Sequence, residues 1–334
     1  MPATIHDVRP EDLGQTSVRS QFARDVLVGL SQTRKFLQSK YFYDDRGSEL
    51  FTQITQAEEY YPFDAEREIL TNQAAAIADW IGTRPFNLVE LGAGDGQKTR
   101  HLLRELTARK LDFHFAPIDI SRGAIEQLVT NLDPEFPDLA YDGIASEYFT
   151  GLRWLTENRP ERFNVVLFLG STIGNFETHT AQTFLCQLWA VLQPNDLALI
   201  GFDLKKDIQR MIAAYNDRDG VTRAFNLNLL ERINRELGGN FDLDKWTHYE
   251  PYEPDHGAMM SYLISLEPQR VEIEACGRSF AFDAWEPIFT ECSVKYTETE
   301  IRNLAHGAGF EVQHNLFDSR HDFCDSLWHR RKGE

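Results

Sequence analysis

The sequence predicts an α/β fold, in which a Rossmann-like, doubly wound parallel sheet carries an inserted α+β module. Two patterns support this prediction. Apolar runs that suit buried strands alternate with helical patterns between residues 86 and 202. The first such run, residues 87–91, leads into a turn that contains Gly92, Gly94 and Gly96, and a helical pattern follows at once. A strand that ends in a glycine turn and opens a helix is typical of nucleotide-cofactor sites.

Composition and charge exclude several classes of protein. The chain has 334 residues, which suits one large domain or two modules. Its net charge of -18 argues against nucleic acid or an anionic membrane as a partner, because both attract basic surfaces. The 4 cysteines and 10 histidines have no spacing typical of a metal site, so we expect no metal. The absence of a signal peptide and of an apolar run of about 18 residues predicts a cytoplasmic protein. We also expect a monomer that acts on a small molecule.

The N-terminal part begins with a polar, irregular stretch, residues 1–14, which we interpret as a loose arm. Helical periodicity starts near Ser20. An aromatic segment follows, and its tyrosines are Tyr41, Tyr43, Tyr60 and Tyr61. Any one of these rings is explained more simply as part of a core. Several tyrosines beside few large aliphatic residues nevertheless predict a pocket lining that carries hydroxyl groups.

The middle of the chain shows the alternation of strands and helices that a parallel sheet requires. Helices are predicted at residues 64–78, 97–108, 122–132 and 178–192, and strands at residues 86–91, 113–118, 139–144, 164–169 and 196–202. Ser121 stands where a helix N-cap is expected.

The pattern changes after residue 203, which predicts an inserted module. Residues 205–237 are helical, and strands are predicted at residues 259–266, 270–275 and 278–282. A helix at 299–308, a strand at 310–315 and a charged tail then return to the first module. The predicted domains are therefore residues 15–63 plus 206–292, which bind the substrate, and residues 64–205 plus 293–334, which bind the cofactor.

The glycine turn has the spacing G-x-G-x-G, and two acids, Glu90 and Asp95, stand beside it. The dinucleotide fingerprint is G-x-G-x-x-G, which seats a pyrophosphate, and two carboxylates would repel that group. Both acids suit a cofactor that carries an ammonium and a sulfonium. We therefore predict that Glu90, Gly92, Gly94 and Gly96 bind S-adenosylmethionine.

A second acid follows the next predicted strand. Asp119 ends that strand, where a carboxylate can accept hydrogen bonds from both ribose hydroxyls. The simpler alternative is an acid that the dipole of the next helix favours. Glu147 and Tyr148 follow the third strand, where Glu147 could hold the adenine amino group. Lys98, just after the glycine turn, completes the predicted cofactor-binding set.

Five blocks resemble one known family, the histidine-specific Nα-methyltransferases, and the resemblance extends from about Phe36 to Trp328. That family's best-known member converts histidine to its trimethylated betaine, hercynine, at the start of ergothioneine biosynthesis. The resemblance implies a class I methyltransferase sheet that binds S-adenosylmethionine, together with an amino-acid substrate. The blocks are YFYDDRGSELF at 41–51, EYYP at 59–62, ELGAGDGQKTR at 90–100, FLGSTIGNF at 168–176 and TECSVKY at 290–296.

The resemblance also implies roles for individual residues in substrate binding. Tyr43, Phe51 and Tyr60 match pocket positions in the N-terminal segment. Gly170 and Asn175 fall in the loop after the fourth strand, where the family's asparagine holds the amino-acid backbone.

Four further positions lie in the inserted module or directly after it. Tyr215 matches a tyrosine that binds the substrate carboxylate, and Glu291 and Ser293 match the pair that grips the imidazole. From the residues alone, Glu291 would be read as a surface acid paired with a lysine. One position departs from the family, because the histidine enzymes often have methionine at about the place of Ser261, and here Met259 and Met260 stand just before it. Either the alignment slips by one or two residues or the pocket has another shape. This departure leaves the substrate side chain less certain than the reaction.

These assignments predict an S-adenosylmethionine-dependent methyltransferase acting on the α-amino group of L-histidine, up to the trimethylated betaine, with Tyr43 and Asn175 orienting the amine. One alternative is an Nα-methyltransferase of another amino acid or amine, such as a tryptophan derivative. A nicotinamide-dependent dehydrogenase is disfavoured by the glycine spacing and by Asp95. A noncatalytic scaffold is disfavoured by the polar pocket positions.

Overall fold

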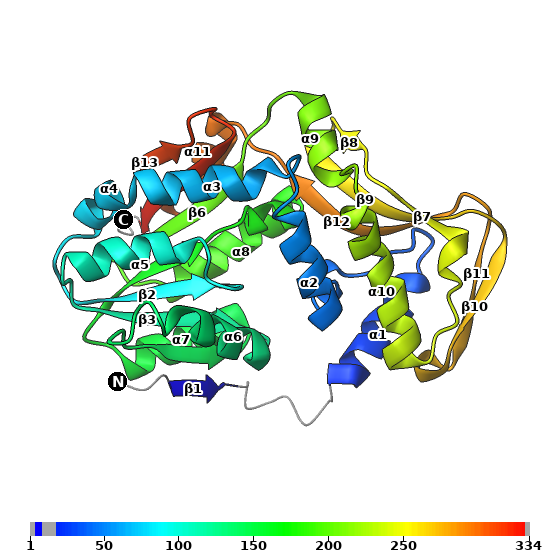
Figure 1. Cartoon of the computed structure of the whole chain (residues 1–334), viewed down its shortest axis with the longest axis horizontal. Coiled ribbons are helices and arrows are strands. Elements are labelled where there is room, and N and C mark those ends of the chain that lie inside the picture. The colour runs from blue at the N-terminus through cyan, green and yellow to red at the C-terminus, as the bar shows by residue number, and fades with distance from the viewer. Residues whose placement is uncertain (1–3, 9–17, 331–334) are drawn as a thin grey trace. The chain divides into compact units, whose positions relative to one another are not determined.

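The computed structural model describes residues 4–8 and 18–330, and it divides into two compact units (Figure 1). Unit 1 comprises 62–205 and the described residues of 1–12 and 295–334. Unit 2 comprises 206–294 and the described residues of 13–61. The chain thus leaves unit 1 after its last parallel strand and returns to it for the final hairpin.

Unit 1 is built on an eight-stranded sheet in the order β1-β4-β3-β2-β5-β6-β14-β13. The pairs from β1 to β6 are parallel, and β14 is antiparallel to both of its neighbours. The chain runs outward from β2 in one direction and from β5 in the other, so the order reverses between these two strands, and ligands bind at such a point. The strands are β1 (Thr4–Asp7), β2 (Phe86–Leu91), β3 (Phe113–Asp119), β4 (Asp142–Ala145), β5 (Phe163–Phe168), β6 (Leu197–Asp203), β13 (Phe310–Phe317) and β14 (Phe323–Arg330).

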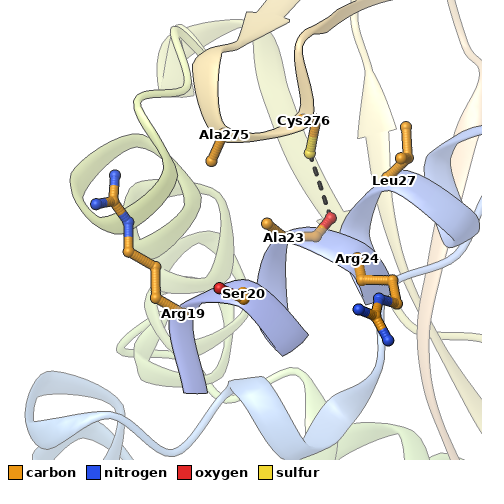
Figure 2. Close-up of a pocket in the computed structure, with 7 residues that line it drawn as sticks. All are labelled: Arg19, Ser20, Ala23, Arg24, Leu27, Ala275 and Cys276. Atoms are coloured by element: carbon orange, nitrogen blue, oxygen red, sulfur yellow. Dashed lines mark hydrogen bonds between the residues drawn. The ribbon is translucent and has the colours of Figure 1, made fainter. Parts of the chain in front are cut away.

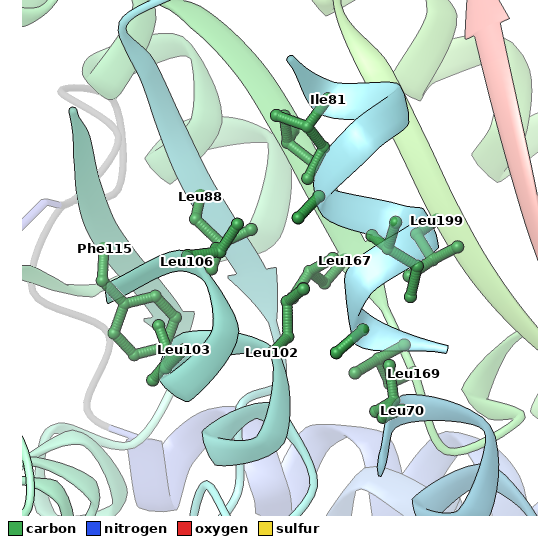
Figure 3. Packing of buried hydrophobic residues seen from close by; sticks show 14 of the residues in the cluster. Leu70, Ile81, Leu88, Leu102, Leu103, Leu106, Phe115, Leu167, Leu169 and Leu199 are labelled. Atoms are coloured by element: carbon green, nitrogen blue, oxygen red, sulfur yellow. The ribbon is translucent and has the colours of Figure 1, made fainter. Parts of the chain in front are cut away.

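Helices cover this sheet, and β2 is buried along its whole length as a central parallel strand should be. Figure 3 shows one of the packed faces, where leucines of α5 meet side chains of the strands. The helices are α3 (Tyr61–Asn72), α4 (Ala74–Ile81), α5 (Thr99–Ala108), α6 (Arg122–Leu132), α7 (Tyr148–Asn158), α8 (Thr178–Val191) and α11 (Glu298–Gly307), with a 3-10 turn η2 (Thr172–Asn175). Ser121 caps α6 as predicted, because its side chain accepts a hydrogen bond from the Ala124 N–H.

Unit 2 has its own core, in which helices pack with a small antiparallel sheet of order β12-β9-β7. Its helices are α1 (Val18–Leu30), α2 (Asp45–Ile54), α9 (Ile208–Tyr215) and α10 (Val221–Leu237), with 3-10 turns η1 (Ser39–Tyr41), η3 (Leu243–Lys245) and η4 (Glu274–Cys276). Its strands are β7 (Trp246–Tyr249), β8 (Tyr252–Glu253), β9 (Ala258–Ser265), β10 (Gln269–Ile273), β11 (Arg278–Phe282) and β12 (Pro287–Val294).

Both predictions for the chain ends were wrong where the structure describes them. Thr4–Asp7 form the edge strand β1, paired in parallel with β4, whereas the rest of the expected arm lies outside the described residues. The predicted charged tail contains β14, which lies between β6 and β13. Apolar and polar residues follow one another in pairs in this strand, so it lacks the alternation that would predict a strand, although most of it is buried.

Two predicted helices are each broken in two. The helix expected at residues 64–78 becomes α3 and α4, and the one expected at 205–237 becomes α9 and α10. Gly220 stands just before α10 with φ 72°, a conformation that favours glycine and ends regular helix geometry.

Unit 2 also has a surface depression of about 570 Å³ between α1 and the η4 turn (Figure 2). It is lined by Arg19, Arg24 and Cys276 among others, and the Cys276 thiol donates to the Ala23 carbonyl. None of the predicted site residues lines this depression.

Candidate active site

The glycine turn after β2 has the backbone geometry that its sequence predicts. Gly92, Gly94 and Gly96 have φ values of 72°, 55° and 74°, a region that side chains rarely tolerate. A Cβ on Gly92 would lie 2.9 Å from the Tyr148 hydroxyl oxygen. The turn therefore brings bare backbone close to Tyr148. The helix begins at Thr99 rather than at residue 97.

Glu90, at the end of β2, lies buried beneath this turn with 4% of its surface exposed. The Thr99 hydroxyl donates to its Oε1, and no donor among the residues described by the structure reaches its Oε2. Burial raises the pKa of Glu90 to about 8. A cationic group beside it would stabilise the ionised carboxylate and lower that pKa. The arrangement thus fits a cofactor that carries positive charge.

Asp119 and Tyr148 lie close together at the ends of β3 and β4. Asp119 Oδ1 accepts the Ser121 N–H at 2.8 Å, and burial raises the pKa of this carboxyl. Burial first, and then the negative charge of Asp119, raises the pKa of Tyr148 to about 12. Glu147 is the N-cap residue of α7, next to Tyr148. The predicted cofactor residues therefore meet at one end of the sheet.

Ile120 was not predicted, although it follows Asp119 directly. Its side chain is 74% exposed, which is unusual for a large apolar residue. The signal available in the sequence was an isoleucine directly after the acid that ends the strand.

The loop after β5 brings Gly170 beside Lys98. A Cβ on Gly170 would lie 3.2 Å from Lys98 Nζ, and Lys98 pairs with the fully buried Glu66. The Gly170 N–H donates to Glu66 Oε1 at 2.7 Å, and Ser171 Oγ accepts the Asp203 N–H at 3.0 Å. Asn175 ends the 3-10 turn that follows. The sequence analysis missed Glu66, because an acid in a helix usually lies in solvent.

In unit 2 the predicted aromatic residues form one connected chain of rings. The ring centroids are 5.5 Å apart for Tyr43 and Phe51, 6.3 Å for Phe51 and Tyr60, and 6.2 Å for Tyr60 and Tyr215. The Tyr215 hydroxyl lies 2.8 Å from Ser293 Oγ. Segments far apart in the sequence thus supply neighbouring side chains.

Phe225 belongs to the same aromatic group and was not predicted. Its ring centroid lies 5.6 Å from that of Tyr43 and 6.0 Å from that of Phe51. It lies in α10, where its helical spacing resembles that of any core residue.

Ser261 stands opposite Glu291 in the β9–β12 ladder, beside a register shift between Phe289 and Glu291. Only 2% of its surface is exposed. Its hydroxyl donates to Asn226 Oδ1 at 2.8 Å and lies 3.1 Å from His248 Nε2. His248 Nε2 also lies 3.0 Å from a Glu250 oxygen. Sequence analysis missed Asn226, His248 and Glu250, because nothing local links them to Ser261.

Comparison with known proteins identifies the family. The family model described as "Histidine-specific methyltransferase, SAM-dependent" matches residues 22–330. This chain belongs to that family. The S-adenosylmethionine cofactor predicted from the sequence is thereby confirmed. The strand order described above confirms the predicted doubly wound α/β sheet. The glycine turn and the buried Glu90 fit that cofactor.

Relatives within and near the family show how far the likeness extends. A protein of Mycolicibacterium smegmatis named histidine N-alpha-methyltransferase is 37% identical over 94% of this chain and 97% of its own length. Ergothioneine biosynthesis protein 1 of Neurospora crassa is 32% identical over 80% of this chain but only 30% of its own length. An L-tryptophan methyltransferase of Psilocybe serbica is 26% identical over 90% of both chains.

The described part of the chain has no helix that is both long and apolar enough to cross a membrane.

Proposed function

We propose that this enzyme transfers methyl groups from S-adenosylmethionine to the α-amino group of L-histidine, up to the trimethylated betaine hercynine, in the first step of ergothioneine biosynthesis. The observation that carries this proposal is the arrangement of Tyr215, Ser293 and Glu291 in unit 2. Tyr215 and Ser293 are hydrogen-bonded, and Glu291 lies two residues from Ser293 in the same strand. The identity of 37% to a histidine enzyme over most of both chains supports it.

The residues proposed to hold the cofactor are those gathered at the strand ends of unit 1. Glu90 and the turn of Gly92, Gly94 and Gly96 would hold its amino-acid part, and Asp119 the ribose hydroxyls. When bound, S-adenosylmethionine supplies an electrophilic methyl group. We assign the remaining contacts to Lys98, to Glu147 at the adenine amino group, and to Tyr148.

The proposed work of the remaining residues is to orient the substrate amine for an in-line displacement. Holding two reactants in the right geometry can lower a barrier by ~7–11 kcal/mol. The amine must be neutral when it attacks, so hydrogen-bond acceptors and burial should favour its free base. We propose that Tyr43 helps to orient the amine. We propose the same role for Asn175, which ends the 3-10 turn in the loop that begins at Gly170.

Recognition of the rest of the substrate would fall to unit 2. Tyr215 would hold the carboxylate, while Glu291 would accept an imidazole N–H, with Ser293 and Tyr60 completing the ring's hydrogen bonds. The faces of Tyr43 and Phe51 can stabilise a growing methylammonium by cation–π contact, which permits repeated transfer.

A second candidate is Nα-methylation of another amino acid, such as a tryptophan derivative. Ser261 favours it, because the histidine enzymes often have methionine at this position, and because its hydroxyl is already bonded to Asn226 and His248. A related protein is named as a tryptophan methyltransferase. We also propose that the enzyme is a cytoplasmic monomer. Its cysteines are free thiols, which agrees with a reducing compartment.

One experiment separates the two candidates. The protein is incubated with labelled S-adenosylmethionine and each amino acid in turn, and the products are identified by mass. We expect mono-, di- and trimethylated histidine. Absence of methylated histidine at saturating cofactor would refute the first candidate, and a methylated tryptophan would favour the second.

A further inference from the structure

Unit 1 contains a pair of buried carboxyl groups that the reaction as described above does not use. Glu66 in α3 and Asp325 in β14 are both 0% exposed. The two meet over Gly201 in β6, where a Cβ would collide with Glu66 Oε1 and would lie 3.2 Å from Asp325 Oδ1. The missing side chain at Gly201 thus makes the space in which both carboxyl groups fit.

The hydrogen bonds of the two carboxyl groups differ sharply. Glu66 pairs with Lys98, and its two oxygens accept the Gly170 N–H at 2.7 and 3.0 Å. For Asp325, neither oxygen has a hydrogen-bond donor within the described ranges 4–8 and 18–330. Donors stabilise an ionised carboxylate, and their absence favours the protonated form. The contacts therefore place the negative charge on Glu66.

The surrounding charges agree with this division. Lys98 is the cation beside the pair, and Glu90 lies close enough to act on Lys98 and Glu66. Two ionised carboxylates with one cation would leave a buried negative charge, which is costly. Burial first, and then the charge of Glu66, raises the pKa of Asp325 well above its ordinary value, while Lys98 lowers it.

We propose that Glu66 and Asp325 share one proton, held on Asp325, and act as a positioning pair for the cofactor half of the site. The ionised Glu66 holds the Lys98 ammonium and the Gly170 N–H in place. The protonated Asp325 donates to Glu66 and fixes it from the side of β14. This inference rests on the cofactor role proposed for Lys98.

The pair has a consequence for cofactor binding. With one shared proton, the group formed by Glu66, Asp325 and Lys98 is neutral overall, and Lys98 can attract the carboxylate of the cofactor. If Asp325 lost its proton, the group would carry a net negative charge and would repel that carboxylate. The proton on Asp325 therefore supports cofactor affinity.

Variants of the enzyme show whether Asp325 acts as a neutral, protonated group or as an ionised carboxylate. Asp325→Asn keeps a neutral donor, so the calorimetric Kd for S-adenosylmethionine should change by less than about threefold. Glu66→Gln removes the charge that holds Lys98, so the Kd should rise about tenfold or more. Asp64→Asn changes an exposed acid in the same helix and should leave the Kd unchanged. An equal loss in Asp325→Asn and Glu66→Gln would overturn the proposal.

A spectroscopic measurement tests the proton directly. In protein labelled with 13C at aspartate carboxyls, the Asp325 signal should stay at a protonated position from about pH 5 to pH 8. Asp325→Asn identifies the signal by its loss. If that variant does not fold, Glu66→Gln identifies it by a shift, because a neighbouring charge is gone. A signal at the ionised position throughout this range would overturn the proposal.

Measurements on the wild-type enzyme distinguish a failure of the carboxyl pair from a failure of the proposed histidine methylation. Cofactor binding without methylation of histidine would refute the histidine proposal and leave the carboxyl pair untouched. Methylation of histidine by an enzyme whose Asp325 is ionised would refute the pair alone.

Discussion

The two units offer different kinds of polar group. In unit 1 the candidate residues stand at strand ends around a bare glycine turn, and one oxygen of Glu90 has no donor within the described chain. In unit 2 the polar side chains already bond to one another, as in the pair of Tyr215 and Ser293 and in the link from Ser261 to Asn226. The comparison suggests that unit 1 recognises its ligand by backbone shape and charge. Unit 2 would recognise its ligand by a network of side chains, so the two should respond differently to mutation.

The largest effect is expected from Glu291→Ala. Loss of a hydrogen bond to a charged group costs about 1.5–3 kcal/mol, so the KM for histidine should rise roughly 10- to 100-fold. Calorimetry should find the Kd for S-adenosylmethionine unchanged. Glu272→Ala, an exposed acid of β10, is the matched control and should leave both constants unaltered. Equal weakening of substrate and cofactor would mean that Glu291 has a structural role.

Asp119→Ala tests the proposed cofactor-binding residues of unit 1. Removing the proposed acceptor for the ribose hydroxyls should raise the Kd of S-adenosylmethionine about tenfold. The KM for histidine, measured at saturating cofactor, should stay near the wild-type value. Asp112→Ala removes an exposed acid that precedes the same strand and serves as the control. Unchanged cofactor affinity in Asp119→Ala would remove the ribose assignment.

The raised pKa of Glu90 predicts a pH effect on cofactor binding. Below about pH 8 the carboxyl holds its proton, and a bound cation favours its loss. Binding should therefore release a proton, and the affinity for S-adenosylmethionine should increase several-fold between about pH 6 and pH 8. Calorimetry in two buffers of different ionisation enthalpy measures the proton release. Persistence of the same pH dependence in Glu90→Gln would assign it to another group.

The smallest effect is expected from Ser261→Ala. This variant tests whether the hydrogen bonds that link Ser261 to Asn226 and His248 contribute to substrate binding. The change removes one of the hydroxyl donors to Asn226 and a neighbour of His248, at a cost of about 1 kcal/mol. The KM for histidine should rise by about three- to fivefold, with no change in the cofactor Kd. Thermal unfolding of the variant provides the control for a general loss of stability. A kcat/KM for histidine equal to that of the wild type would show that Ser261 lies outside the recognition network.

Much of the cofactor half could be predicted, because its signals are local in the sequence. The turn of Gly92, Gly94 and Gly96 has the left-handed backbone that its glycines allow. Asp119 stands at the strand end where the alternation of strands and helices puts it. The backbone geometry at each of these positions is set by residues next to it in the chain, so the local sequence pattern predicts that geometry.

The residues proposed to bind the substrate could be assigned only by their resemblance to the family's motifs. Nothing in the local pattern around Tyr43, Tyr215 or Ser293 indicates that rings and hydroxyls from these segments adjoin. Their proximity follows from the tertiary packing of unit 2, which brings the ring of Tyr43 beside Phe51 and the hydroxyl of Tyr215 beside Ser293. Phe225 and His248 were missed for the same reason.

The sequence by itself determined the glycine turn, the alternation of strands and helices between residues 86 and 203, and with them the cofactor. Only the tertiary structure determined which groups surround each buried ionisable side chain. Asp325 was assigned to a charged tail, yet it lies in a strand paired on both sides and faces Glu66 over Gly201. A charged residue is expected to be exposed when only the sequence is known, because water is its usual environment. Its protonation depends on burial and on groups distant in the chain, and only the folded packing brings these together.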